Sequence, residues 1–511
     1  AKSSGAHAVD NAKRIIEEMW QRYNDGDKSL APDTISYTSL IDAWSKSSSP
    51  DAGENAEGVL REMWEKSRDH PKLRIKPNQR SYGGVINAWA KSTRPRSAEN
   101  SALILEEMWE LYKGGDSSIA PNVVTYTSLI DAWSKSSSPY AGKEAESVLR
   151  DMLQRHEAHP EMDLEPNTMC YSGVINAWGK SSDPHSVENA TRVLEEMWQS
   201  YQNGNEQCAP ATVSYNSLID AWSKSSSPNA GEKAEDVLRS LWDIHRTYPD
   251  MDMKPNQKSY SGVINAWAKS NDPHAAGNAT RILGEMWKLY EAEGDMSIAP
   301  NTISYNSLID AWSKSPWLDA AEKADGVLRE MWEISGTYPQ FEIRPDQKSY
   351  SGVINAWANS ADARAADNAA QALRDQWTRY VADGDMSLAP DTVSYTALIH
   401  AWSRSADPES GEKAERVLRE MWEVSSSHPE LDAEPNQRSY MEVIKAYNKN
   451  GDSDAVNRIY QEMCKKLEVT TSEKVDEVTT SDSSPSDGNS VCSSTEAEER
   501  VEQLIQETIF D

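Results

Sequence analysis

The stretch that decides the fold is residues 35–46, which read I-S-Y-T-S-L-I-D-A-W-S-K. Its apolar residues stand at positions i, i+3, i+4 and i+7, the stripe of an amphipathic helix: Tyr37, Leu40, Ile41 and Trp44. Ser-Ser-Ser-Pro at residues 47–50 ends this helix, because proline disfavours helical geometry in the residue before it. A second apolar stripe follows between residues 56 and 64, so the segment predicts a helical hairpin.

This hairpin is repeated along almost the whole chain of 511 residues. The tyrosine recurs every 44 or 45 residues, with a proline five residues before each copy: Tyr37, Tyr82, Tyr126, Tyr171, Tyr215, Tyr260, Tyr305, Tyr350, Tyr395 and Tyr440. Odd copies read like S-Y-N-S-L-I-D-A-W-S-K-S and even copies like S-Y-S-G-V-I-N-A-W-A-K-S, so two copies make the larger period. One hairpin cannot bury its apolar stripes alone, whereas stacked neighbours can. The pattern therefore predicts an all-α solenoid with a continuous core.

The sequence divides into three parts. Residues 1–31 hold a second helix without its first helix, and a linker, so we expect the chain to begin within a repeat. Residues 32–465 hold ten hairpins, of which the last is atypical and is expected to cap the array. Residues 466–511 are acidic and rich in Ser and Thr, a composition that predicts a disordered tail.

Several classes of function find no support in the sequence. It has no run of about 18 apolar residues, and the mean hydropathy is −0.74, so we expect no membrane span. The four cysteines form no C-x-x-C pair and no zinc-like cluster with histidine. Phosphate-loop, zinc-protease and hydrolase motifs are missing too. We therefore expect no enzyme activity, no cofactor, no metal and no small-molecule substrate.

The repeated pattern Y-[TNSG]-x-[LV]-I-[DN]-A-W-x-K, followed by A-x-x-V-L-x-E-M and P-[ND], resembles the pentatricopeptide repeat family. The resemblance covers residues 6 to about 465, although this unit is about ten residues longer than that of the family. It implies a right-handed α/α superhelix whose first helices line a concave groove, and sequence-specific binding of single-stranded RNA at one base per repeat. It also implies a mitochondrial or chloroplast location, and it allows other RNA-processing proteins as partners. We expect the additional residues of each unit to lie at the edge or the outer surface.

A basic residue stands at the end of almost every predicted first helix. Thr38, Asp42 and Lys46 are spaced four residues apart, so the cation shares one helix face with two polar positions. Stacked hairpins would align these cations in a ladder that we predict to contact RNA phosphates: Lys46, Lys91, Lys135, Lys180, Lys224, Lys269, Lys314, Arg404 and Lys449, with Asn359 as the exception. The alternative interpretation is that each cation only stabilises the carboxyl end of its helix.

The net charge of −30 does not by itself exclude RNA, because the charge is unevenly distributed. Bases outnumber acids by fourteen to eight on the ten predicted first helices. The excess acid lies on the second helices, the linkers and the tail. Such an acidic outer surface would slow association with RNA and weaken non-specific binding.

The family resemblance assigns two further sets of positions to base recognition. The residue two before each tyrosine sandwiches a base, and here it is aliphatic or basic: Ile35, Arg80, Val124, Met169, Val213, Lys258, Ile303, Lys348, Val393 and Arg438. The residue after the tyrosine forms a specificity pair with the residue after the following proline: Thr38 with Asn78, Gly83 with Asn122, Thr127 with Asn167, Ser172 with Ala211, Asn216 with Asn256, Ser261 with Asn301, Asn306 with Asp346, Ser351 with Asp391, and Thr396 with Asn436. The family's pairing rule reads them as 5′-A-?-A-?-C-A-U-G-A-3′. Asn or Asp after proline also caps a helix, which explains the second member of each pair but not the first.

Two functions of different classes follow. The leading hypothesis is a non-catalytic, sequence-specific RNA-binding solenoid that acts in organellar RNA processing, stability or translation. The alternative is a scaffold whose concave groove binds a peptide or a helical protein partner, which the acidic total and the longer unit favour. The cation ladder and the Asn/Thr pairs favour RNA.

Overall fold

The computed structural model describes residues 3–251 and 253–476, and all regular structure in these ranges is helical. Ten first helices begin shortly after the repeated proline: α2 (Thr34–Lys46), α4 (Gln79–Lys91), α6 (Val123–Lys135), α8 (Thr168–Trp178), α10 (Thr212–Lys224), α12 (Gln257–Lys269), α14 (Thr302–Ser313), α16 (Gln347–Asn359), α18 (Thr392–Arg404) and α20 (Gln437–Lys449). The second helices alternate with them: α1 (Ser3–Asn24), α3 (Ala52–Asp69), α5 (Ser97–Lys113), α7 (Ala141–Ala158), α9 (Ser186–Gln202), α11 (Ala230–Thr247), α13 (Ala275–Glu293), α15 (Ala320–Thr337), α17 (Ala365–Asp383), α19 (Ser410–Ser427) and α21 (Ser453–Asp476). Short 3-10 turns lie in the linkers: η1 (Lys28–Leu30), η2 (Ser117–Ile119), η3 (Glu206–Cys208), η4 (Pro339–Phe341) and η5 (Met386–Leu388).

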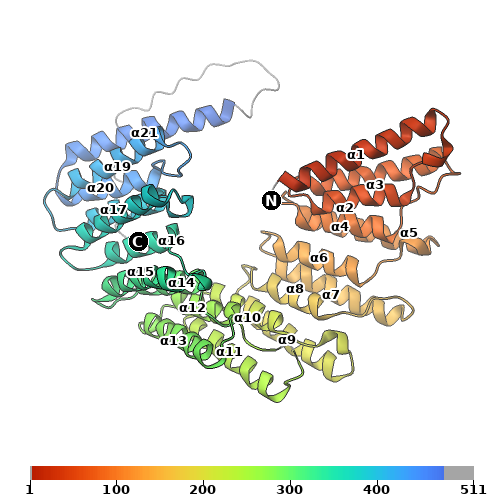
Figure 1. Cartoon of the computed structure of the whole chain (residues 1–511), viewed down its shortest axis with the longest axis horizontal. Coiled ribbons are helices and arrows are strands. Elements are labelled where there is room, and N and C mark those ends of the chain that lie inside the picture. Colours follow the sequence, from red (N-terminus) through yellow and green to blue (C-terminus); the bar gives the residue numbers. More distant parts are fainter. Residues whose placement is uncertain (1–2, 252, 477–511) are drawn as a thin grey trace.

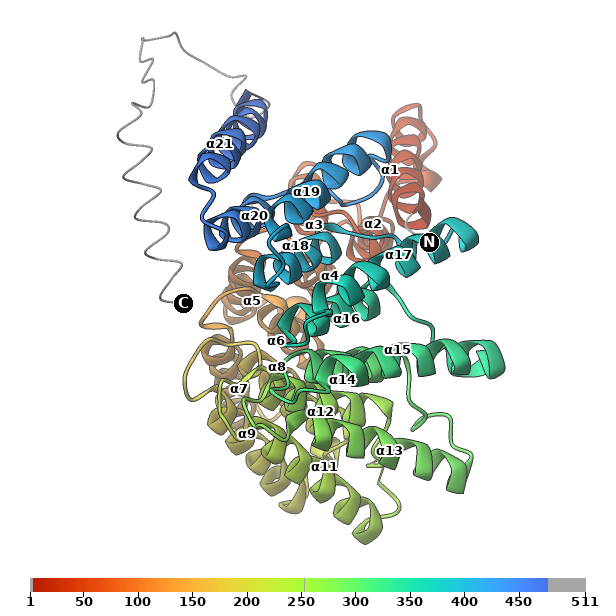
Figure 2. The same ribbon diagram turned by 90° about the vertical axis from the view of Figure 1, so that its left-hand side faces the viewer.

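The hairpins stack in an open arc, with α1 and α21 at its two ends and α10 to α12 near its middle (Figure 1). Each first helix contacts the first helices of its neighbouring hairpins, while the second helices pack on first helices rather than on one another. The first helices therefore form the closely spaced inner layer of the arc. Figure 2 shows this stacking for α12, α14, α16 and α18. The predicted all-α solenoid of stacked hairpins is confirmed.

The repeated aromatic residues form the core between the two layers. The ten tyrosines of the repeat are at most 5% exposed. In nine of the ten hairpins, the tyrosine hydroxyl accepts a hydrogen bond from a tryptophan on the preceding second helix, as Trp242 Nε1 does to Tyr260 at 2.8 Å. The buried apolar residues form two overlapping clusters, one from Val9 to Met253 and one from Ile219 to Met463. The core thus runs along the described array, as the sequence predicts.

The alternation of odd and even hairpins has a packing cause. A glycine on each of four even first helices lies against an isoleucine of the preceding odd first helix: Gly84, Gly173, Gly262 and Gly352. A Cβ atom at Gly173 would stand 2.6 Å from Ile130 Cγ2, so the absence of a side chain lets the two helices approach closely. In the last hairpin, Glu442 takes this place. The two-hairpin period is therefore a property of the inner layer.

Two expectations about the ends and linkers need correction. The additional linker residues are not confined to the surface, because the residue two before the proline is at most 1% exposed in every hairpin from the second onward: Ile75, Ile119, Leu164, Cys208, Met253, Ile298, Ile343, Leu388 and Ala433. Helix α21 continues through Asp476, past residue 466, where the tail was predicted to begin. The remainder of the predicted tail, residues 477–511, lies outside the described residues.

Candidate nucleic-acid interface

The predicted base-sandwiching positions form an exposed row at the start of the first helices. Its aliphatic members are between 42% and 74% exposed, although large apolar side chains are normally buried: Ile35, Val124, Met169, Val213, Ile303 and Val393. The basic members, Arg80, Lys258, Lys348 and Arg438, are exposed as well. Arg80 reaches back to the preceding first helix, where its Nη2 lies 2.8 Å from Asp42 Oδ2. The row therefore presents apolar and guanidinium or ammonium groups to a ligand rather than to the core.

The structure brings the members of five predicted specificity pairs together across successive hairpins, directly or through a serine. Asn306 Nδ2 donates to Asp346 Oδ1 at 3.0 Å, and Asn216 Nδ2 donates to Asn256 Oδ1 at 3.3 Å. Elsewhere a serine joins the two members, as Ser81 Oγ lies 3.0 Å from Thr38 Oγ1 and 3.1 Å from Asn78 Oδ1. The same serine-linked arrangement holds Ser261 to Asn301 through Ser304, and Thr396 to Asn436 through Ser439.

The second members of the pairs also cap helices. Eight of the nine accept a hydrogen bond from the backbone N–H of the third helical residue, and Ala211 is the exception. The predicted capping interpretation is therefore confirmed. Capping uses Oδ1 and leaves the Asn Nδ2 group, or the second Asp oxygen, for another partner. Because the cap fixes the side chain, it also orients the remaining polar atom.

The first members are less accessible than the row of aliphatic residues. Thr38, Asn216 and Thr396 are 4%, 5% and 6% exposed, and their polar atoms bond to the next hairpin. Thr127 is half-buried and donates to Val123 O at 2.7 Å, close to Cys170 Sγ. A base could reach the Asn amides and the cap side chains more directly than the buried hydroxyls.

The predicted cation ladder is present, and every member is exposed. Its members hold different partners. In the second, fourth and tenth hairpins the side chain reaches the carboxyl end of the preceding first helix, as Lys91 Nζ does to Ser45 O at 3.0 Å and Lys180 Nζ to Ser134 O at 2.7 Å. In the third, fifth and seventh hairpins it pairs with the aspartate one turn earlier, as Lys135 does with Asp131 at 2.5 Å, and Lys314 makes both kinds of contact. The alternative helix-end role is thus found for some members, directed to the neighbouring helix.

The ladder cations influence one another electrostatically. Burial and the nearby charge of Lys224 lower the pKa of Lys180, while Asp220 and Asp131 act in the opposite direction. Like charges on successive hairpins disfavour the protonated form when they are close. A polyanion along this row would relieve that repulsion.

Hairpins 3 to 6 enclose a hollow of about 360 Å³ on the inner layer, where several of these positions meet. Its lining includes Thr127 and Ser172 from the specificity pairs and Met169, Val213 and Lys258 from the exposed row. Asp131, one turn before the ladder cation Lys135, lines it too. The hollow combines apolar walls with hydrogen-bonding groups, the composition expected of a site for a flat heterocyclic ring.

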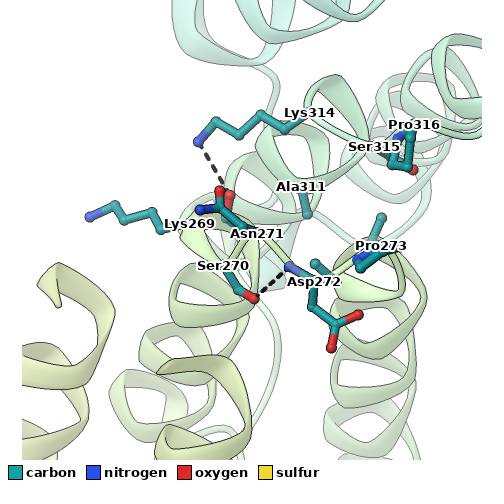
Figure 3. Close-up of a pocket in the computed structure, with 12 residues that line it drawn as sticks. Lys269, Ser270, Asn271, Asp272, Pro273, Ala311, Lys314, Ser315 and Pro316 are labelled. Atoms are coloured by element: carbon teal, nitrogen blue, oxygen red, sulfur yellow. Dashed lines mark hydrogen bonds between the residues drawn. The ribbon is translucent and has the colours of Figure 1, made fainter. Parts of the chain in front are cut away.

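A second type of pocket lies beside the ladder at the hairpin turns. Figure 3 shows the pocket of about 490 Å³ between the turns after α12 and α14, with Lys269 and Lys314 projecting to the same side. Lys314 Nζ lies 3.2 Å from Ala268 O. Asp272 and Pro273 come from the turn, and no residue of a specificity pair lines this pocket. The predicted specificity pairs and this turn pocket are therefore separate parts of the surface.

Sequence reasoning missed the partners of two sets of residues in this interface. One is the residue before the tyrosine, which is serine except at Thr125 and Cys170 and links several of the specificity pairs. The other is the residue between the specificity position and the ladder, Asp or Asn in the first eight hairpins, whose place on the ladder face was predicted but whose ion pairs were not. Both recur at the 44- or 45-residue spacing, so periodicity alone marks them, but only the contacts show their partners.

Across the described ranges, no helix is long and apolar enough to cross a membrane. The described residues also hold no group of three or more His, Cys, Asp or Glu side chains placed to bind a metal ion.

Comparison with known proteins places the last hairpin in a family. A family model described as PPR repeat matches residues 438–466, which lie in α20 and α21. No curated protein matches the chain. Among solved structures, the crystal structure of the pentatricopeptide repeat protein PPR10 from maize is similar at 20% identity and a TM-score of 0.28, covering 92% of this chain and 68% of that chain. The matched residues belong to the last of ten hairpins that share one sequence pattern, so the similarity to the pentatricopeptide repeat family is established for that hairpin.

Proposed function

We propose that this protein binds single-stranded RNA along the inner layer of its arc. The observation that carries the proposal is the exposed aliphatic row, since six large apolar side chains at one repeated position remain uncovered by the fold. A row of this kind, beside a ladder of cations, fits a ligand that offers flat apolar rings and a charged backbone at regular intervals. Single-stranded nucleic acid has both.

The spacing of the hairpins supports an extended strand. Packed helices lie about 8–10 Å apart, whereas successive nucleotides of a stacked strand rise about 3.4 Å. One nucleotide per hairpin is therefore possible only if the bases are unstacked. Apolar or guanidinium groups from neighbouring hairpins would then replace the lost base stacking. Stacking of a base on a protein side chain contributes up to about 1–3 kcal/mol of binding free energy per base.

The specificity pairs support sequence selection at each hairpin. Where Asn306 and Asp346 meet, a donor and an acceptor remain beside each other after the cap bond is made. We propose the readout 5′-A-?-A-?-C-A-U-G-A-3′ for the nine pairs, and a role in organellar RNA processing, stability or translation, both on the family resemblance. Sequencing of RNA selected from a randomised pool tests the readout, and a pool without this motif would refute it.

Anisotropy with a randomised single-stranded RNA pool, across a salt series, tests RNA binding itself. The variant V124S/M169S/V213S removes three apolar side chains of the exposed row, two of which (Met169 and Val213) line the hollow, without exposing the core, and we expect it to weaken binding at least tenfold. The matched control L103S/L318S/V381S changes apolar side chains that are 61%, 86% and 74% exposed on second helices or a turn, and it should bind as the wild type does. Wild-type protein that binds no RNA at low salt would refute the proposal and make the inner layer a site for a protein partner.

A further inference from the structure

A third row of polar residues lies on the inner layer between the base-reading positions and the cation ladder. It comprises Asp42, Asn87, Asp131, Asn176, Asp220, Asn265, Asp310, Asn355, His400 and Lys445. Each stands four residues after a base-reading position and four before a ladder position, except that the last two hairpins depart from the Asp/Asn alternation. Residues four apart share a helix face and are about 6 Å apart along the axis. This middle row therefore separates the two parts of the proposed RNA site.

Three of the four aspartates of this row are held in one orientation, whereas Asp42 pairs with Arg80 of the next hairpin. Asp131, Asp220 and Asp310 each bind their ladder lysine through Oδ2, at 2.5, 2.5 and 2.7 Å. Their side chains are 42%, 38% and 42% exposed. Within the described part of the chain, their Oδ1 atoms receive no hydrogen bond. Each carboxylate thus has one oxygen fixed on a cation and one oxygen open to a ligand.

The hollow shows what that ligand would be. Asp131 lines it together with Met169 and Val213, which would contact the base, and Thr127 and Ser172, which would read the edge of the base. The ladder cation Lys135 lies one helical turn further on. Because the sugar joins base to phosphate in every nucleotide, a nucleotide placed on these two groups sets its ribose against Asp131.

We propose that the middle row recognises ribose, with the aspartate Oδ1 atoms accepting a hydrogen bond from the 2′-hydroxyl, so that the protein selects RNA over DNA. The inference rests on the proposed RNA binding. The 2′-hydroxyl is the group by which a protein distinguishes the two nucleic acids at a given site, and an ionised carboxylate can only accept. The asparagines of the even hairpins carry an amide oxygen that can serve in the same way.

The last two hairpins fall outside this ribose row. His400 Nδ1 lies 2.9 Å from Glu442 Oε2, and Lys445 Nζ lies 3.0 Å from Glu442 Oε1. Ser403 Oγ also donates to Glu442 Oε2, at 3.0 Å. Both oxygens of this carboxylate, which is 6% exposed, are occupied by the protein. Selection for ribose should therefore end at the eighth hairpin.

Two triple variants test the inference. D131A/D220A/D310A removes three acceptors, whereas D131N/D220N/D310N removes the same three charges and keeps an amide oxygen at each site. Both release the ladder lysines and should strengthen binding to any polyanion. The ratio of RNA affinity to DNA affinity separates them, measured by anisotropy with oligonucleotides of one base sequence, ribose or deoxyribose throughout.

We expect wild type and the Asn variant to prefer RNA to a similar degree. The Ala variant should lose about fivefold in preference per site, and of the order of a hundredfold over three sites if the effects add. The control E110A/D236A/D243A removes three acids from exposed ion pairs on second helices and should keep the wild-type ratio. An Ala variant with the wild-type ratio, or wild-type protein that binds DNA as tightly as RNA, would refute the ribose row and leave RNA binding intact. Binding to neither nucleic acid would instead refute the proposed function.

Discussion

Replacing ladder lysines of the two kinds should separate RNA binding from stability. The variant K135A/K224A removes cations that pair only with an aspartate of their own helix, and K91A/K180A removes cations that bond to the preceding hairpin. Each lost phosphate contact changes the slope of log Kobs against log salt by about 0.7 for a single strand. Both variants should therefore reduce the slope by about 1.4, out of about 6 for nine cations.

The stabilities of the two variants should differ. Exposed ion pairs one turn apart contribute at most a few tenths of a kcal/mol, so K135A/K224A should unfold at the wild-type urea concentration. Loss of the bonds to Ser45 O and Ser134 O, at 3.0 and 2.7 Å, should cost K91A/K180A about 1–3 kcal/mol in total. The assays are anisotropy from 50 to 300 mM salt and urea unfolding followed by circular dichroism. An unchanged slope for K135A/K224A would mean that Asp131 and Asp220 already neutralise these lysines, and the phosphate role would be refuted.

Three further perturbations test the packing. G173A should destabilise the protein by about 1–3 kcal/mol in urea unfolding, because its Cβ atom would stand 2.6 Å from a side chain of the neighbouring helix. The control G284A, whose Cβ atom would meet nothing within 4 Å, should stabilise the protein by about 0.5–1 kcal/mol. Equal effects of the two substitutions would contradict the close approach of the two first helices at Gly173. Burial raises the pKa of Tyr260 to about 12, so stability should be complete below about pH 10, the value for an unfolded tyrosine, and be lost as pH rises towards 12; a helix signal that does not fall by pH 12 would argue against it. D325E/Q371R should raise the melting temperature, because it gives these two repeat positions the Glu–Arg ion pair that Glu235 and Arg281 form in the preceding two hairpins. An unchanged melting temperature would show that this ion pair does not contribute to stability.

The sequence predicted the architecture because its main determinant is periodic. Ten tyrosines at one spacing set the hairpins, and the apolar stripes set which face of each helix is buried. Ile35 and its counterparts stand outside these stripes, and the structure leaves them exposed. The members of the specificity pairs are 39 or 40 residues apart in sequence, and pairs such as Asn216 with Asn256 meet because successive hairpins stack in one repeated geometry.

The partners of the ladder residues could not be predicted from the pattern. Lys91 and Lys135 occupy the same position in the repeat, yet one bonds to a neighbouring helix and the other to its own aspartate. The partner depends on whether Asp or Asn stands one turn earlier and on how closely the two helices approach, and the repeat pattern does not specify this distance. Similarly, Ile119 lies in a polar linker without helical periodicity, so nothing in the local pattern marks it as buried.

The alternation of hairpins leads to a last prediction, that the array tolerates loss of two hairpins better than loss of one. Trp178 lies with its ring against Gly142, where a Cβ atom would stand 2.4 Å away, and donates to Glu146 Oε2 at 2.8 Å. Deleting residues 123–167 would place this even hairpin after another even one, where Ala98 and Ala102 occupy the corresponding places.

That single deletion therefore leaves the indole N–H without its acceptor and sets a methyl group against the ring, at a cost of about 1–3 kcal/mol for each. Deleting residues 123–211 instead joins an even hairpin to an odd one, as in the intact chain. The tryptophan packing and the indole hydrogen bond within each remaining odd–even pair of hairpins are then unchanged. Urea unfolding should show a lower midpoint for the single deletion, although that chain is the longer of the two. Equal midpoints, or a more stable single deletion, would show that hairpins act singly and that the two-hairpin period has no energetic consequence.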